Sequence, residues 1–217
     1  MKRAIIFANG RMDVAPPIIK DIQTSDLIIA ADGGTNHCKK LGITPNVIIG
    51  DLDSLDPIDL SNYHQAGVEI IQYSTHKDET DLELALQLTL KHEITQVIII
   101  GALGARWDMT ITNVLLAAHP RYAKLCIRIL DIFQELVILR GEAQLDIKGK
   151  PGSIISLIPI AGDVNGITTH GMEYSLNNET LNFGTSRGVS NVLLHPHAQV
   201  FIKGGILLLC VNHKEDE

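Results

Sequence analysis

Residues 46–54 read NVIIGDLDS, an aliphatic run that ends in a glycine and two aspartates. Its continuous aliphatic part is typical of a strand that is covered on both faces of a sheet. Similar runs, each followed by a predicted helix, occur on either side of this stretch. We predict strands at residues 4–8, 27–31, 46–49, 69–72, 96–100 and 125–130, and helices at residues 16–23, 35–41, 57–66, 81–91 and 110–118. This alternation indicates an α/β fold with a doubly wound, mainly parallel sheet.

The pattern changes after residue 131. Helical periodicity is lost, and short β-prone runs follow one another between turn signals such as Gly204-Gly205. We predict strands at residues 135–139, 144–147, 154–158, 167–169, 200–202 and 206–211. The chain is therefore predicted to have two domains, an α/β domain at residues 1–131 and a small antiparallel all-β domain, a sandwich or roll, at residues 132–217.

Composition narrows the classes of partner. The chain has 217 residues and a formal net charge of -7, so it offers no basic field for nucleic acid or for an anionic membrane. No apolar run approaches the roughly 20 residues that a membrane-spanning helix needs. The three cysteines are sparse and far apart, a pattern that fits a reducing compartment better than a disulfide framework. We expect a cytoplasmic protein that binds neither nucleic acid nor membrane.

Acidic and glycine-rich loops follow four consecutive predicted strands, at residues 32–34, 50–54, 77–81 and 101–108. In a parallel sheet these loops all leave the carboxyl edge, where open α/β folds bind ligands. Asp51 and Asp53 are two residues apart, so in an extended stretch their side chains point the same way. A cluster of carboxylates needs a cation, and Mg²⁺ prefers oxygen ligands together with substrate phosphates. The four loops therefore predict a site for Mg²⁺ and a phosphorylated ligand.

Glycines and two basic residues complete this phosphate-binding pattern. Glycines allow close approach of the backbone to phosphates, and a cation offsets the charge that moves during phosphoryl transfer. A structural interpretation exists for each acid alone, because aspartate at a strand end is often a turn residue or a helix N-cap. The coincidence of four such loops favours the functional interpretation. The residues concerned are Gly33, Gly34, Gly50, Gly101, Gly104, Lys77 and Arg106.

In this order, the loops resemble the thiamine pyrophosphokinase family. The matching segments are ADGG at residues 31–34, GDLDS at 50–54, KDETD at 77–81 and GALGARWD at 101–108. The second half adds SLIP at 156–159, GITTHGM at 166–172 and GTSRGVSN at 184–191. The resemblance thus extends over nearly the whole chain, and the combination of its first three segments is quite specific.

The resemblance implies an enzyme that moves the diphosphate of ATP to the hydroxyl of thiamine, with Mg²⁺, as a homodimer. It implies a catalytic group of Asp51, Asp53, Asp78, Asp81 and Lys77, of which Asp51, Asp53 and Asp81 hold the metal. It implies nucleotide contacts at Asp32, Gly33, Gly34, Gly101, Gly104, Arg106 and Asp108, and substrate contacts at Thr80, Ser186, Ser190 and Asn191. Asp78 and Asp81 are alternative proton acceptors, and either one or two Mg²⁺ ions fit the pattern.

The fourth loop departs from the family pattern, which has a second glycine where Ala105 stands and a histidine where Met109 stands. We expect altered nucleotide contacts at this loop rather than loss of function. The lone Trp107 is expected to pack against the sheet, with stacking on a ligand ring as the alternative.

Other functions remain as alternatives. A diphosphate transferase for another small alcohol, such as a pterin, would share the fold, and so would a nucleotide or thiamine sensor without catalysis. The intact acidic loops argue against the sensor, and the segment at residues 188–191 argues against the pterin enzyme. A dinucleotide-binding fold is excluded because no G-x-G-x-x-G follows the first strand. A zinc site at His195 and His197 lacks a third ligand. His170 lies inside a matched segment and could border the substrate pocket, whereas the other histidines, His37 among them, form no pattern.

Overall fold

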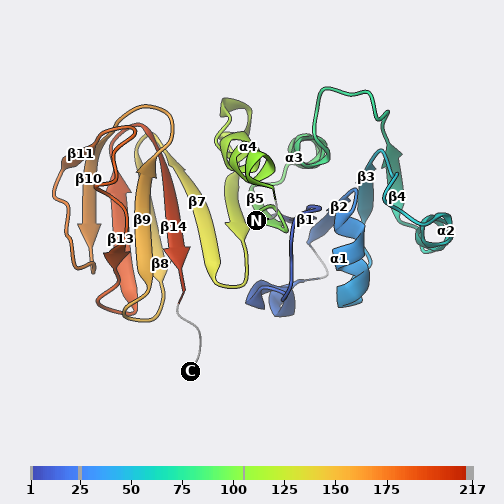
Figure 1. Ribbon diagram of the computed structural model, residues 1–217, viewed down its shortest axis with the longest axis horizontal. Helices are drawn as coiled ribbons and strands as arrows, with labels where there is room; N and C mark the ends of the chain where they lie inside the picture. Colours follow the sequence, from blue (N-terminus) through green and yellow to red (C-terminus); the bar gives the residue numbers. More distant parts are fainter. Residues whose placement is uncertain (1, 24–25, 105, 214–217) are drawn as a thin grey trace. The chain divides into compact units, whose positions relative to one another are not determined.

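The computed structural model describes residues 2–23, 26–104 and 106–213 (Figure 1). The chain forms two compact units, Met1–Ile132 and Phe133–Glu217. The first contains every α-helix among the described residues, and the second consists of strands joined by loops. The α/β fold class with a following antiparallel β domain is confirmed.

Six parallel strands form the sheet of the first unit. They lie in the order β6-β5-β1-β2-β3-β4, so β1 pairs with both β2 and β5. The chain moves outward from β1 to β4 and then returns to the other side of β1, which places the topological switch point between β1 and β5. The strands are β1 (Arg3–Phe7), β2 (Leu27–Ala31), β3 (Val47–Gly50), β4 (Glu69–Gln72), β5 (Gln96–Ile100) and β6 (Cys126–Leu130).

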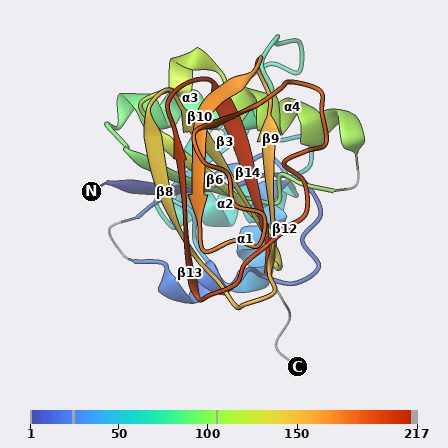
Figure 2. The same cartoon turned by 90° about the vertical axis from the view of Figure 1, so that its left-hand side faces the viewer.

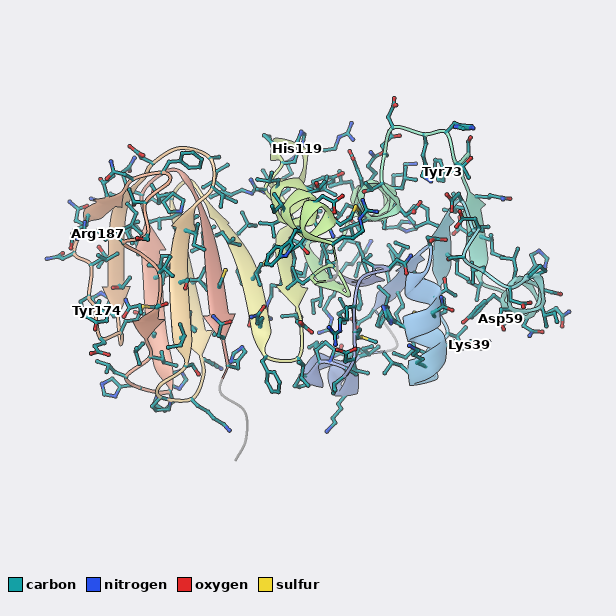
Figure 3. All side chains as sticks on the ribbon, in the orientation of Figure 1. Lys39, Asp59, Tyr73, His119, Tyr174 and Arg187 are labelled. Carbon is teal, nitrogen blue, oxygen red and sulfur yellow. The ribbon has the colours of Figure 1, made fainter. Side chains whose placement is uncertain are left out.

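Helices cover both faces of this sheet. One face packs against apolar side chains of α1 (Gly34–Leu41) and α2 (Pro57–Gln65). The other face meets α3 (Asp81–Lys91), which contacts β1, β2 and β3 through side chains outside that first cluster. Lys39 of α1 and Asp59 of α2 form an ion pair at 2.6 Å that joins the two helices (Figure 3).

Two predicted helices differ from those observed. The helix predicted at residues 16–23 is a short 3₁₀ helix, η1 (Pro17–Asp21), and a second 3₁₀ turn, η2 (Pro120–Tyr122), precedes β6. The last helix, α4 (Trp107–Ala117), begins three residues before the predicted start at residue 110. Its N-cap residue, Arg106, makes no side-chain capping bond among the described residues, so the sequence carries no capping signal there.

The second unit is a sandwich of two antiparallel layers, β12-β9-β14-β7 and β11-β10-β13-β8 (Figure 2). Buried aliphatic side chains from strands of both layers form one core, as alternation along each strand requires. The short strands β11 and β12 were not predicted. The elements are β7 (Gln134–Arg140), β8 (Ala143–Lys148), β9 (Ile154–Pro159), β10 (Val164–His170), β11 (Glu179–Leu181), β12 (Asn191–Val192), β13 (His197–Ile202) and β14 (Ile206–Asn212).

The helices that the structure describes are too short or too polar to span a membrane. All three cysteines are free thiols; Cys38 is buried, whereas Cys126 is exposed on β6. Burial raises the pKa of Cys38 to about 12 and that of Cys210 to about 11, so neither is a ready thiolate.

Candidate active site

Three aspartates meet at the carboxyl ends of β2 and β3. One carboxylate oxygen from each of Asp32, Asp51 and Asp53 lies within 4.8 Å of the other two, the one group among the described residues whose spacing could hold a metal ion. Asp32 is buried, and its carboxylate accepts a hydrogen bond from the Ser54 hydroxyl at 2.8 Å. Its backbone has a φ of 43°, a conformation that non-glycine residues adopt at turns and functional sites. The buried position and the hydrogen bond thus hold the Asp32 carboxylate within the cluster.

The three carboxylates of this cluster repel one another, and the repulsion changes the pKa of Asp53. The charge of Asp51, followed by desolvation and the charge of Asp32, raises the pKa of Asp53. Like charges held this close favour either a proton or a cation between them. Three hard oxygen donors form a set that Mg²⁺ accepts, so the residues fit the ion that the sequence predicted.

Lys77 is the counter-ion of the neighbouring carboxylates. Its ammonium nitrogen lies 3.0 Å from the Asp81 carboxylate and 4.0 Å from that of Asp51, and its side chain is 12% exposed. Asp81 opens α3 behind the N-cap Thr80, whose hydroxyl accepts a hydrogen bond from the Glu83 amide at 3.2 Å. Burial raises the pKa of Asp81 despite the opposing effect of Lys77. The ion pair therefore links this fourth carboxylate to the three-aspartate cluster.

A cavity of about 350 Å³ lies beside this ion pair at the switch point of the sheet. Loops that follow β1 and β5 form one wall, and the start of α3 and one side of α4 form others. The lining is charged near Lys77, Asp81 and Arg106 and apolar near Leu82, Ala102 and Met109. The switch point is where open α/β sheets bind their ligands, and the cavity combines a charged part with an apolar part that suits a ring. Thr80, Gly101 and Gly104, all predicted contacts, also line it.

Other predicted nucleotide residues are placed differently. Gly33 and Gly34 are buried where α1 starts, and a side chain at Gly34 would collide with the Phe7 carbonyl, so these glycines allow the helix to pack on β1. Asp78, which was predicted in the catalytic group, is exposed and does not appear among the described residues that line the cavity. Asp108 is exposed and forms an ion pair with the Arg106 guanidinium. Arg106 lines the cavity, whereas Asp108 does not appear in its lining among the described residues.

The expectation for Trp107 was wrong. Its side chain is 80% exposed, and it forms a stripe on α4 with Ile111 and Leu115, which are also exposed. Because these three residues are four apart, they share one side of the helix. Met109 lines the cavity, while Ala105 lies outside the described residues.

Comparison with known proteins assigns the family. A model of the thiamin pyrophosphokinase catalytic domain matches residues 19–129, and a model of the thiamin pyrophosphokinase vitamin B1 binding domain matches residues 142–207. The chain belongs to the thiamin pyrophosphokinase family. The first match contains the three-aspartate cluster, Lys77 and Asp81, and the second falls within the β sandwich.

Relatives and solved structures agree with this family. The chain is 29% identical over 210 residues to thiamine pyrophosphokinase of Bacillus subtilis, a match that covers 96% of this chain and 98% of the relative. A crystal structure of the Bacillus subtilis protein superposes with a TM-score of 0.88 at 27% identity, covering 99% of this chain and all of that one. Thiamin pyrophosphokinase from Candida albicans, at 15% identity, shares the fold with a TM-score of 0.81 and covers 98% of this chain and 89% of its own.

Within the region matched to the family's vitamin B1 binding domain, Asn191 is a buried clamp. Its side-chain oxygen accepts a hydrogen bond from the Tyr174 amide at 2.9 Å, and its side-chain nitrogen donates to the Tyr174 carbonyl at 2.7 Å. Asn191 is 6% exposed, so its amide group is already used inside the unit. Tyr174 itself is 64% exposed (Figure 3). Asn191 thus holds the segment that presents this ring, a function that the motif did not predict.

The two predicted serines of this segment are exposed. Ser190 has a φ of 63°, and its amide donates to the Ser156 hydroxyl at 3.2 Å, which fixes the turn before β12. Ser186 accepts a hydrogen bond at its carbonyl from the Val189 amide at 3.1 Å. Both hydroxyls stand on the surface of the second unit, where a ligand can reach them.

Asn191→Ala is expected to lower the free energy of unfolding by about 1–3 kcal/mol, because two backbone groups of Tyr174 lose their hydrogen bonds to a buried amide. Chemical denaturation with urea measures the change. Ser190→Ala, which removes an exposed hydroxyl from the adjacent residue, is the matched control and should stay within about 0.5 kcal/mol of the wild type. Equal stability of N191A and wild type would contradict a stabilising role for the Asn191 hydrogen bonds to Tyr174.

Proposed function

We propose that this chain catalyses transfer of the diphosphate of ATP to the hydroxyl of thiamine, giving thiamine diphosphate and AMP. The observation that carries the proposal is the position of the cavity at the switch point, next to four carboxylates and one largely buried lysine, in a chain of this family. Thiamine is itself a cation, so an acidic site suits it as the acceptor.

The metal site that we propose consists of Asp32, Asp51 and Asp53. It differs from the predicted set in one member, since Asp32 takes the place of Asp81. The mutual distances within 4.8 Å support this set, and the ion pair with Lys77 occupies Asp81. When bound, Mg²⁺ would neutralise phosphate charge and favour departure of AMP.

The residues of the chain supply positioning and charge. Lys77 and Arg106 face the cavity and would stabilise the negative charge that spreads over the phosphoryl oxygens. In the reaction, the thiamine hydroxyl oxygen forms a bond to the β-phosphorus, and the bond from that phosphorus to the oxygen of the α-phosphate breaks. AMP leaves with that oxygen.

The hydroxyl proton needs an acceptor, and we propose the Asp81 carboxylate. Asp81 lines the cavity, whereas Asp78 is exposed and outside the lining given by the described residues. Burial around Asp81 supports this choice, because a carboxylate in a less polar setting is a stronger base.

We further propose a cytoplasmic homodimer that uses ATP. Three free thiols fit a reducing compartment. The exposed apolar stripe of Trp107, Ile111 and Leu115 supports the homodimer, since burial of these side chains against a partner subunit would be favourable.

An acceptor panel tests the function. Purified protein with ATP and Mg²⁺ should release AMP rapidly with thiamine and at background rate with a hydroxymethyl pterin or without acceptor. Turnover with the pterin and not with thiamine would contradict thiamine as the acceptor and identify a pterin diphosphate transferase. Binding of ATP without turnover on any acceptor would favour the sensor.

A further inference from the structure

His37 is a buried side chain on α1 to which the mechanism gives no part. It is 8% exposed, and its Nε2 lies 2.8 Å from the carbonyl oxygen of Gly10 in the loop that follows β1. A carbonyl oxygen accepts, so Nε2 carries the hydrogen and donates. The other ring nitrogen, Nδ1, is buried and has no hydrogen-bond partner among the described residues. Among the described residues this ring therefore has one hydrogen-bond partner, and that partner lies in a loop of the cavity.

The loop that His37 anchors is bound tightly to a second one. The amide of Gly10 donates to the carbonyl of Gly101, in the loop after β5, at 2.6 Å. Gly101 has a φ of 72°, and a side chain there would come within 2.6 Å of the Ala8 carbonyl and about 3.3 Å of the His37 ring. Gly10 and Gly101 both line the cavity. Gly10 and Gly101 thus form one hydrogen-bonded wall of the cavity at the switch point, and the His37 ring packs behind this wall.

Both polar groups of the Gly10 backbone are used in this wall. The amide points to Gly101 and the carbonyl to His37, which fixes the plane of both flanking peptides. A glycine without such partners has the widest conformational freedom of any residue. The His37 contact therefore restricts a glycine of the wall that would otherwise have wide conformational freedom.

We propose that His37 is a positioning residue for nucleotide binding: its Nε2–H holds the Gly10–Gly101 wall in the shape that receives Mg·ATP. This role rests on the proposed function, because it requires the cavity to bind ATP. His37 acts through the wall and reaches neither the phosphates nor the acceptor. Its removal should affect the affinity for ATP more than the rate of the bound complex.

Two amide variants test whether a donor at the position of Nε2 is required or whether any polar side chain is sufficient. In His37→Gln, the amide nitrogen stands as many bonds from the backbone as Nε2 of histidine; in His37→Asn, it stands where Nδ1 is. We expect H37N to raise the Kd for Mg·ATP, measured by calorimetry without thiamine, by roughly ten-fold, the effect of one lost hydrogen bond. H37Q should stay within about three-fold of wild type, and kcat at saturating ATP should change little in either.

Cys38→Ala is the matched control. Cys38 is the next residue on the same helix and is fully buried in the core beneath α1. C38A should lower the melting temperature without changing the Kd for Mg·ATP, which separates a loss of stability from a loss of wall geometry. His37→Met, which fills the space without any donor, replaces H37N in the comparison if H37N does not fold.

The outcomes are distinct. Weak ATP binding in H37N or H37M, with near wild-type binding in H37Q, supports the role of His37. Equal affinities in all variants, or equal losses in H37Q and H37N, overturn it while the proposed function stands. A wild-type protein that does not bind Mg·ATP overturns the proposed function, and the role of His37 falls with it.

Discussion

Asp53→Asn is expected to lower turnover by on the order of 100-fold or more, while the metal-free protein becomes as stable as wild type or more so. Loss of turnover follows from removal of one of the three carboxylates that we assign to the metal, and losses of a charged group at a phosphoryl-transfer site have this magnitude. The gain in stability follows from the repulsion that raises the pKa of Asp53, because the amide carries no charge. Asp53 is exposed, so the substitution disturbs no core packing.

The stability difference between D53N and wild type should depend on pH in one direction. A carboxyl whose pKa is raised on folding destabilises the fold when it ionises, so its unfavourable effect is absent at low pH and appears as the pH rises through the raised value. In EDTA, D53N should therefore exceed wild type in melting temperature at neutral pH, and the difference should vanish below about pH 4. Mg²⁺ should raise the melting temperature of wild type and not that of D53N. A variant that keeps both its turnover and its Mg²⁺ response would contradict the metal assignment.

Lys77→Met is expected to reduce turnover by about 100-fold and to destabilise the metal-free protein by about 1–3 kcal/mol. The turnover effect arises because Lys77 faces the cavity, where phosphate charge must be offset. The stability effect arises because the pair with Asp81 at 3.0 Å is largely shielded from solvent, and its loss leaves a carboxylate without its cation. Steady-state kinetics and urea denaturation in EDTA measure the two effects.

Lys39→Met provides the matched control for Lys77. Lys39 forms an ion pair of similar length with Asp59, but its side chain is 60% exposed. Exposed pairs contribute little, so K39M should keep its turnover and lose no more than about 0.5 kcal/mol. K77M should also bind Mg²⁺ more tightly than wild type, since nearby carboxylates lose a competing cation. Wild-type turnover in K77M would contradict the proposed role of Lys77 in offsetting phosphate charge.

Much of the first unit could be predicted from local sequence. Its strands are continuous aliphatic runs, and a parallel sheet brings the ends of such strands to one edge, so Asp51 and Asp53 could be expected near each other. The start of α4 could not be predicted, because Arg106 provides no cap. The strand β12 could not either, since two residues form it by pairing with Ile154 and Ile155.

The site departs from prediction where tertiary contacts decide a residue's role. The Tyr174 backbone uses the amide group of Asn191 from 17 residues away, and the sequence motif does not reveal this contact. His37 bonds to a backbone carbonyl 27 residues before it, so no spacing of side chains could indicate it. Asp32 belongs to the group that we propose for the metal because the turn after β2 and its hydrogen bond with Ser54 place its carboxylate near Asp51 and Asp53.

The most direct measurement quantifies both products from ATP and thiamine in the presence of Mg²⁺. The proposed reaction predicts one AMP for each thiamine diphosphate, and no AMP when thiamine is omitted. Formation of ADP with thiamine monophosphate would contradict transfer of a diphosphate, and so would a folded protein that binds Mg·ATP yet forms neither product.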